Sequence, residues 1–146
     1  MTDVLSGDAL SSASRARDAN EGETRITILV CGSCRHPGQP SETWPRPGSA
    51  LVEATRAAAR DSAIDVKQVG CLGNCKRGLS AAILRDGSWS YIFGELGTES
   101  AADLVAGATL FSRSTDGFMP FRDRPEALKR GLIARVPTAA NLKDLT

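Results

Sequence analysis

Apolar and polar residues alternate with a period of two in two short segments of the chain. Thr24–Val30 places Ile26, Ile28 and Val30 on one face, and most of its residues are β-branched. Ile64–Val69 shows the same alternation. A period of two in segments of this composition predicts a β-strand in each of them.

The segment between these strands predicts a loop and then a helix. Four prolines from Pro37 to Pro47 exclude a regular helix up to about Gly48. Ser49 is then predicted to cap a helix that ends near Asp61, and its apolar face consists of Leu51, Ala54, Thr55 and Ala58. A strand, a helix and a strand within about 45 residues form a βαβ unit, so the two strands are predicted to be parallel.

Two more apolar runs, at residues 79–84 and 89–93, flank the dipeptide formed by Asp86 and Gly87. Asp-Gly between apolar runs predicts an antiparallel hairpin with a type I′ turn, which needs positive φ at both central residues.

A second helix is predicted to begin at Thr98 or Ser100 and to end near Phe111, and its apolar face consists of Ala101, Leu104, Val105 and Ala108. The order β-α-β-β-β-α up to this point is that of a thioredoxin-like α/β domain. Further on, Pro125 is predicted to open a short helix that reaches about Ile133.

The pattern divides the chain into three parts. Residues 1–23 are rich in Ser, Ala, Asp and Arg and contain few apolar residues, a composition typical of a disordered tail. Residues 24–113 contain the predicted thioredoxin-like domain. Residues 114–146 follow as a C-terminal extension that is predicted to pack on the domain.

Composition and charge narrow the class of protein. The 146 residues suffice for one domain with a hydrophobic core. The formal net charge of +1 gives no argument for binding to nucleic acid. No apolar run approaches the about 20 residues of a membrane helix, and the N-terminal stretch lacks the apolar region of a secretory signal. We therefore expect a cytoplasmic protein without membrane partners, and in that compartment paired cysteines more often serve metal or redox chemistry.

All four cysteines follow the two strands of the predicted βαβ unit. Cys31 and Cys34 come after the first strand, and Cys71 and Cys75 come after the second. The carboxyl ends of parallel strands lie at the same edge of a sheet, so the four thiols are predicted to share one site. Iron and zinc bind thiolates strongly, and short spacings let one loop supply two ligands. The four cysteines are therefore predicted to hold a metal centre.

Four interpretations of these cysteines remain open at this point. A [2Fe–2S] cluster would use all four thiolates, and so would a zinc ion, although the usual zinc ribbon repeats C-x2-C after about 15–20 residues and this chain does not. A thiol–disulfide oxidoreductase would use Cys31 and Cys34 but leaves Cys71 and Cys75 unexplained. The last interpretation is four buried cysteines without a site. His36 is the one histidine of the chain, and we interpret it as a surface-loop residue.

Basic residues accompany the cysteines and the C-terminal extension. Arg35, Lys76 and Arg77 flank the thiols, where they would favour a cluster of negative charge and steer an acidic partner. Residues 113–135 contain six basic and three acidic residues. This segment is interpreted either as chain folded back over the domain or as a docking surface for an acidic partner.

Three motifs, Val30–Cys34, Gly70–Gly78 and Arg124–Pro137, carry a family resemblance. Together they resemble a family of small bacterial proteins of unknown function that are predicted to bind metal. The cysteine motifs also resemble those of the thioredoxin-like [2Fe–2S] ferredoxins. The resemblance covers residues 24–138, and it implies a thioredoxin-like fold with a [2Fe–2S] cluster on Cys31, Cys34, Cys71 and Cys75.

The resemblance also implies a function. A protein of this kind would carry single electrons to a redox partner protein and would not be an enzyme with its own substrate. The family resemblance suggests a reductive step of cobalamin biosynthesis as the destination. It also raises a homodimer as an alternative to a monomer, which the residues themselves neither favour nor oppose.

Overall fold

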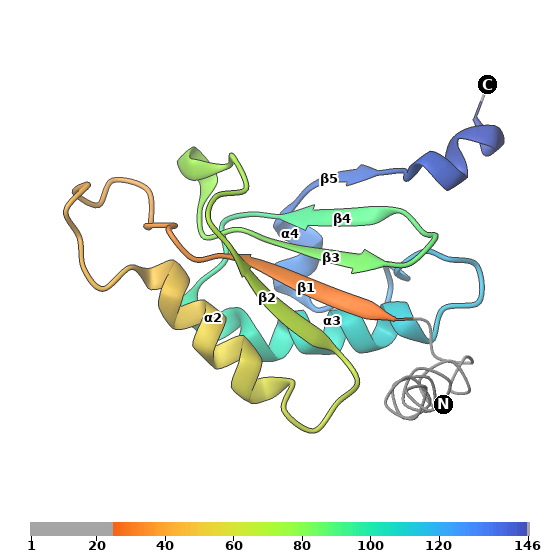
Figure 1. Cartoon of the computed structure of the whole chain (residues 1–146), viewed down its shortest axis with the longest axis horizontal. Helices are drawn as coiled ribbons and strands as arrows, with labels where there is room; N and C mark the ends of the chain where they lie inside the picture. Colours follow the sequence, from red (N-terminus) through yellow and green to blue (C-terminus); the bar gives the residue numbers. More distant parts are fainter. Residues whose placement is uncertain (1–24, 146) are drawn as a thin grey trace, which may run out of the picture.

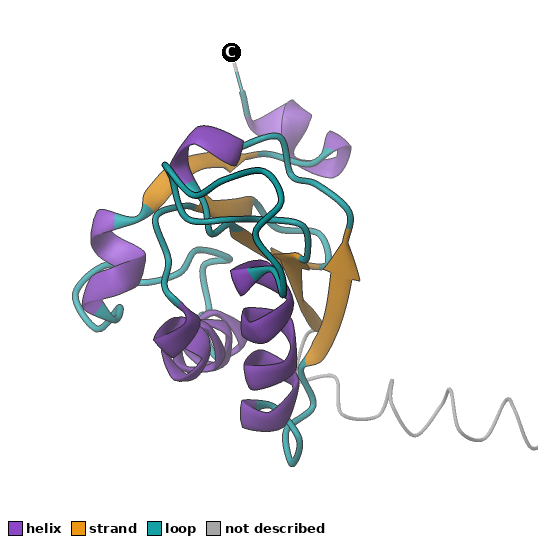
Figure 2. Ribbon diagram, turned by 90° about the vertical axis from the view of Figure 1, so that its left-hand side faces the viewer, coloured by secondary structure: helices purple, strands orange, loops and turns teal. Residues whose placement is uncertain are grey.

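The computed structural model describes residues 25–145, so the tail predicted at residues 1–23 lies outside the described residues. The described residues form one mixed five-stranded sheet in the order β2-β1-β3-β4-β5, and α2 and α3 pack along one face of it (Figures 1 and 2). The elements are β1 (Ile26–Cys31), α2 (Pro47–Ala58), β2 (Asp65–Val69), β3 (Ala81–Arg85), β4 (Ser90–Phe93), α3 (Ala101–Ser112), α4 (Glu126–Arg130) and β5 (Leu132–Val136). Among residues 25–145 no helix is long and apolar enough to cross a membrane.

The parallel pairing that the βαβ pattern predicts is confirmed. β1 and β2 run in the same direction, with Thr27 opposite Asp65 and Cys31 opposite Val69. β3 pairs antiparallel with β1, and β4 pairs antiparallel with β3. β1 and β2 therefore finish at the same end of the sheet (Figure 1), which we call the site end.

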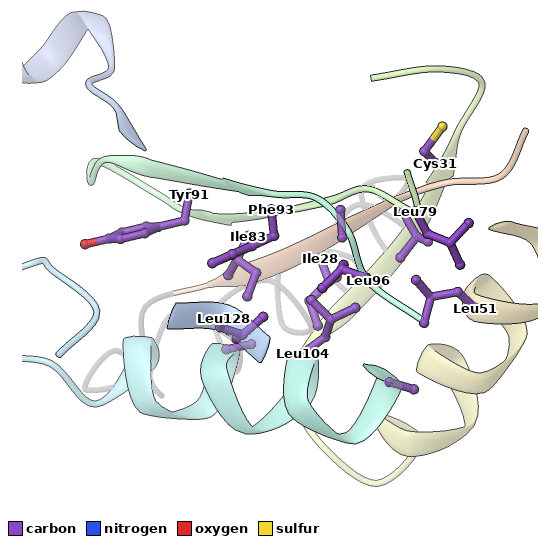
Figure 3. Packing of buried hydrophobic residues seen from close by; sticks show 14 of the residues in the cluster. Ile28, Cys31, Leu51, Leu79, Ile83, Tyr91, Phe93, Leu96, Leu104 and Leu128 are labelled. Atoms are coloured by element: carbon purple, nitrogen blue, oxygen red, sulfur yellow. The ribbon is translucent and has the colours of Figure 1, made fainter. Parts of the chain in front are cut away.

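The hydrophobic core lies between the sheet and the helices (Figure 3). Ile28 of β1, Ile83 of β3 and Phe93 of β4 are fully buried, as are Leu51 of α2 and Leu104 of α3. Complete burial of a side chain of this size contributes about 1.5–3 kcal/mol. These layers of apolar side chains therefore fix the helices against the sheet.

Helix α2 differs from the prediction in its start and its buried face. It begins at Pro47, because the fixed φ of proline suits the first turn of a helix. Ser49 lies inside the helix, and its hydroxyl donates to the carbonyl oxygen of Gly32 at 3.3 Å. Val52 is fully buried and Ala58 is exposed. Burying valine removes more apolar surface from water than burying alanine, so the buried face is turned toward Val52.

The second predicted helix is confirmed as α3. Ser100 occupies its N-cap position, and the Ser100 hydroxyl accepts a hydrogen bond from the Gly97 N–H at 3.0 Å. Leu104 and Ala108 are buried as predicted, whereas Val105 is half-buried.

The hairpin between β3 and β4 is confirmed, but the predicted turn type is wrong. The Ser88 N–H donates to the Arg85 carbonyl at 3.0 Å and closes the turn. Gly87 has a φ of 72°, whereas Asp86 does not have positive φ. A type I′ turn needs positive φ at both residues, and here glycine alone takes the left-handed conformation.

The C-terminal segment contains a strand that the sequence pattern does not predict. Helix α4 ends at Arg130 and β5 then pairs antiparallel with β4, so the predicted helix up to Ile133 is wrong in its last part. The Gly131 N–H donates to Ala127 at 2.9 Å, and the Gly131 carbonyl accepts from the Gly94 N–H at 2.8 Å. The free edge of β4 offers backbone partners that a purely local pattern cannot reveal.

Candidate metal centre

The four cysteines form two pairs of unequal burial at the site end of the sheet. All four are free thiols. Cys31 and Cys34, the buried pair, are 1% and 5% exposed. Cys71 and Cys75, the exposed pair, lie in the segment that follows β2. The structure therefore brings a half-site from each of the two loops to one end of the sheet.

The exposed pair has the separation of two ligands on one metal. The Sγ atoms of Cys71 and Cys75 lie 3.8 Å apart. A tetrahedral ion with metal–sulfur bonds of about 2.3 Å holds two thiolates about 3.8 Å apart. The Gly73 N–H donates to Cys71 Sγ at 3.2 Å, and a donor directed at sulfur favours the thiolate. The exposed pair therefore fits a thiolate-bound metal.

The two thiols of the buried pair interact with each other and differ in pKa. Burial acts to raise the pKa of Cys31, but hydrogen bonds with Cys34, Leu72 and Ser33 outweigh burial and lower it. Burial, followed by the hydrogen bond with Cys31 and the charge of Cys31, raises the pKa of Cys34 to about 12. Metal binding by this pair would release protons, because thiols bind a metal as thiolates.

The loops that carry the two pairs touch each other. The Ser33 hydroxyl donates to the Gly70 carbonyl, and Cys31 Sγ lies 3.9 Å from the same oxygen. The hydrogen bond and charge of Cys71 raise the pKa of Cys75, and the charge of Cys31 adds a smaller effect in the same direction. No three His, Cys, Asp or Glu side chains among residues 25–145 are close enough to hold one ion. The thiols are therefore arranged as two neighbouring pairs.

The first turn of helix α2 packs against the backbone of the buried pair. The loop between β1 and α2 extends away from the site end and returns (Figure 1), so that the Gly48 N–H donates to the Cys34 carbonyl at 3.0 Å. A Cβ at Gly48 would lie 2.3 Å from the Cys31 carbonyl oxygen and 2.9 Å from the Cys34 nitrogen. The positive end of the helix dipole thus lies beside the buried thiols, where it favours thiolates.

Gly48→Ala is expected to destabilise the protein by about 1–3 kcal/mol, because the new methyl group meets backbone atoms that have no room to move. Thermal unfolding followed by circular dichroism measures the change. Gly70→Ala is the matched control, since a Cβ at Gly70 meets nothing within 4 Å. The control is expected to stay within about 0.5 kcal/mol of the original protein. Equal melting temperatures for the two variants would contradict the close packing of α2 on the cysteine loop.

Cations lie beside the exposed pair. The hydrogen bond and charge of Cys71 raise the pKa of Cys75, and the nearby charge of Arg35 acts more weakly in the opposite direction. Arg77 forms an ion pair with Glu95, with a nitrogen–oxygen distance of 3.1 Å. His36 lies in the loop between β1 and α2, as predicted, and its backbone N–H donates to the Gln39 side chain at 2.8 Å. Of these charges, that of Arg35 acts on the exposed pair and would offset the negative charge of thiolates there.

Two polar residues that the sequence pattern does not reveal join the two cysteine loops. Ser80 is fully buried, and its carbonyl accepts from the Cys31 N–H at 3.0 Å. Asn74, between the two exposed cysteines, donates its amide to the Ser80 hydroxyl at 3.0 Å. The position of Asn74 inside the cysteine motif is a signal in the sequence, but its partner Ser80 becomes evident only once the chain is folded.

The fold and the site together define a thioredoxin-like α/β domain with paired thiols at one end of its sheet. The chain belongs to the family described as "Protein of unknown function (DUF1636)", whose model matches residues 28–138 and so includes all four cysteines. No curated protein matches the chain.

Solved structures of a thioredoxin-like [2Fe–2S] ferredoxin from Aquifex aeolicus share this fold. One has a TM-score of 0.51 at 15% identity, covering 77% of this chain and 93% of the ferredoxin chain. A structure of the wild-type ferredoxin has a TM-score of 0.51 at 17% identity, covering 76% of this chain and 98% of that chain. At these identities the likeness shows the fold, and it confirms the predicted thioredoxin-like α/β class.

Proposed function

We propose that the protein binds one [2Fe–2S] cluster and acts as a one-electron carrier, with Cys31, Cys34, Cys71 and Cys75 as ligands. The observation that supports this most is the arrangement of the thiols as two pairs at one end of the sheet. Each iron of such a cluster takes two protein ligands, so two pairs of thiols suit it. When bound, the cluster would supply reversible one-electron chemistry.

The surrounding residues favour the charge that such a centre needs. The amides of Gly73 and Leu72 donate to sulfurs of the exposed and buried pairs respectively. Arg35 places a positive charge near the exposed pair. Backbone donors and a nearby cation stabilise negative sulfur, and hydrogen bonds of this kind also set the potential of a cluster.

Burial argues against the thiol–disulfide oxidoreductase interpretation. Attack of a thiolate on a substrate disulfide requires access to the sulfur. Cys31 and Cys34 are 1% and 5% exposed, so the substrate of such an enzyme would not reach them. The zinc interpretation requires four thiolates around one ion, whereas the described residues present the thiols as two pairs.

A redox partner protein follows from the proposed activity. A cluster with four thiolate ligands in a plant-type ferredoxin has a potential near about −400 mV, which suits delivery of electrons to a reductive step. Cobalamin biosynthesis is the destination that the family resemblance suggests. Reduction of a cobalt corrinoid by its reductase, with the reduced protein as electron source, tests this destination, and the absence of electron transfer would contradict it.

The cluster itself is tested by the visible and electron paramagnetic resonance spectra of protein purified without oxygen, before and after dithionite. We expect visible absorption that bleaches on reduction, an S = ½ signal that appears, and about two irons per chain. A colourless protein with stoichiometric zinc would contradict the electron-carrier function and leave a metal-handling protein in its place.

A further inference from the structure

An exposed tryptophan lies in the loop between β1 and α2. Trp44 is 79% exposed, more than any other large apolar side chain among residues 25–145. Pro37, Pro40 and Pro45 of the same loop are exposed as well. Single apolar residues on a surface are common, but several in one loop with charged residues beside them are typical of a surface that binds another protein.

Hydrogen bonds within the loop fix its backbone on both sides of Trp44. The Thr43 hydroxyl donates to the Pro40 carbonyl at 2.7 Å. The Arg46 side chain donates to the Ser41 carbonyl at 2.9 Å. A loop that is ordered before binding loses less conformational entropy when a partner binds it. Trp44 is therefore presented to solvent by an ordered segment of the chain.

The Trp44 loop and the exposed pair lie at the same end of the sheet. Figure 1 shows the loop between β1 and α2 and the segment after β2 both projecting from the site end. The two segments are joined where they start, because the Ser33 hydroxyl donates to the Gly70 carbonyl. A protein bound to the Trp44 loop would thus lie beside the exposed pair, through which an electron would leave the proposed cluster.

Positive charge accompanies these apolar residues. Residues 32–46 and 70–78 together contain four basic residues and one acidic residue. Arg77 is paired with Glu95. Lys76 is exposed, and its side chain forms no ion pair or hydrogen bond within the described part of the chain. The Arg46 guanidinium donates to a carbonyl, so its charge is not neutralised there. An acidic partner would complement these cations.

The C-terminal extension offers a less suitable docking surface, although residues 113–135 contain six basic residues. Four of the six already interact within the domain, through an ion pair or through contacts with aromatic rings, namely Arg124, Lys129, Arg130 and Arg135. Arg124 is in addition only 7% exposed. Lys76 has no such partner among the described residues, so the site end is the better docking surface for an acidic protein.

We propose that the redox partner docks at the site end, with Trp44 in an apolar pocket of the partner and with Lys76 and Arg46 facing acidic residues. Tryptophan and arginine are among the residues that most often dominate the binding energy of an interface, and opposite charges accelerate the approach of two proteins. This inference rests on the proposed [2Fe–2S] function and adds to it the surface and the charge of the partner.

The test is electron transfer from the reduced full chain to oxidised flavodoxin, measured by stopped flow at low and at high salt. Flavodoxin is the probe because it is a small acidic redox protein with an exposed apolar flavin edge. One electron leaves the cluster, and the flavin takes it up with one proton from water to become a semiquinone. Lys76→Glu should slow this step by about threefold to tenfold at low salt and much less at high salt, because salt screens the charge.

Trp44→Ala should slow the same step by about tenfold at both salt concentrations, because salt does not screen an apolar contact. The matched controls, on the C-terminal extension, are Arg122→Glu and Phe121→Ala, which make the corresponding changes at exposed residues. Both should stay within about twofold of the original rate. Reduction of a small uncharged quinone should be equally fast in all variants, since it needs no docking surface.

Larger effects in the two control variants would place the docking surface on the C-terminal extension and overturn the proposal. Equal rates in all variants, or a flavodoxin rate that does not fall as salt is added, would overturn it while the cluster stands. If Lys76→Glu loses its iron, the comparison of Trp44→Ala with Phe121→Ala decides alone.

A second copy of the chain is the other occupant that the experiment must exclude. Light scattering should give the same mass for the original protein and for Trp44→Ala. A dimer that Trp44→Ala converts into monomers would show that the Trp44 loop binds a second copy, and this result also overturns the proposal. An original protein without iron would overturn the proposed function as well.

Discussion

Cys71→Ala is expected to abolish the metal centre. It leaves Cys75 as the lone thiol of the exposed pair, whose sulfurs now stand 3.8 Å apart. Alanine is a sharper choice than serine, because a serine oxygen can itself bind iron. Iron should fall from about two per chain to near zero, and the visible absorption should disappear with it.

His36→Ala is the matched control for this loss. His36 lies two residues from Cys34 and contains the one imidazole of the chain. If the ligands are the four thiolates alone, this variant keeps its iron and its spectrum. Loss of the centre in His36→Ala together with its survival in Cys71→Ala would show that the ligand set is wrong.

Cys71→Ala also distinguishes the competing interpretations of the cysteines. A dithiol enzyme that uses Cys31 and Cys34 would be colourless from the start, and Cys71→Ala would leave its thiol–disulfide exchange intact. A zinc site on four thiolates would be colourless too, but it would lose its zinc in Cys71→Ala. Iron content, zinc content and thiol–disulfide exchange activity, each measured on the original protein and on Cys71→Ala, therefore distinguish the iron–sulfur, zinc and dithiol interpretations.

The strands and helices that position the cysteines could be predicted because their signals are local. Alternation in β1 and β2 and the helical spacing in α3 depend on neighbours within a few residues. The parallel pairing of β1 and β2 followed from the helix between them. These features suffice to predict that Cys31 and Cys71 arrive at one end of the sheet.

Strand β5 could not be predicted in this way. Leu132 and Ile133 continue the apolar pattern of α4. Gly131 is a local signal for the end of the helix, but nothing in the neighbouring sequence indicates that a strand follows it. The segment becomes a strand because it pairs with the free edge of β4. Tertiary pairing of this kind overrides a weak local preference for helix.

The grouping of the four thiols at one end of the sheet could be predicted, but the difference in burial between the two pairs could not. Sequence spacing groups the cysteines in twos, but it does not show that Cys31 and Cys34 are buried while Cys71 and Cys75 are exposed. That difference arises because the loop after β1 is enclosed by the start of α2, which meets it at Gly48. Contacts between segments far apart in the sequence produce it, as they do the contact of Asn74 with Ser80.

Leu128→Ala is expected to lower the free energy of unfolding by about 2–5 kcal/mol, as large-to-small substitutions in a core do. Leu128 is fully buried and lies beside Leu104 between α3 and the sheet (Figure 3). Its side chain packs directly against the backbone of α3 at Gly107, where a Cβ would lie 2.3 Å from the Leu128 Cδ1 atom. Chemical denaturation followed by circular dichroism measures the effect. Leu142→Ala, at a side chain that is 57% exposed, is the control and should change stability by less than about 0.5 kcal/mol.

This prediction tests whether the C-terminal extension is part of the folded domain. Leu128 anchors α4, and α4 leads to Gly131, whose carbonyl binds the Gly94 N–H at 2.8 Å. Glu95, which follows Gly94, donates its N–H to the Arg77 carbonyl at 2.6 Å. Arg77 lies in the same segment as the exposed pair. Loosening α4 should therefore also make the metal centre easier to remove, and Leu128→Ala should lose iron to a chelator faster than Leu142→Ala. Equal stability and equal rates of iron loss in the two variants would mean that the extension neither stabilises the fold nor supports the site.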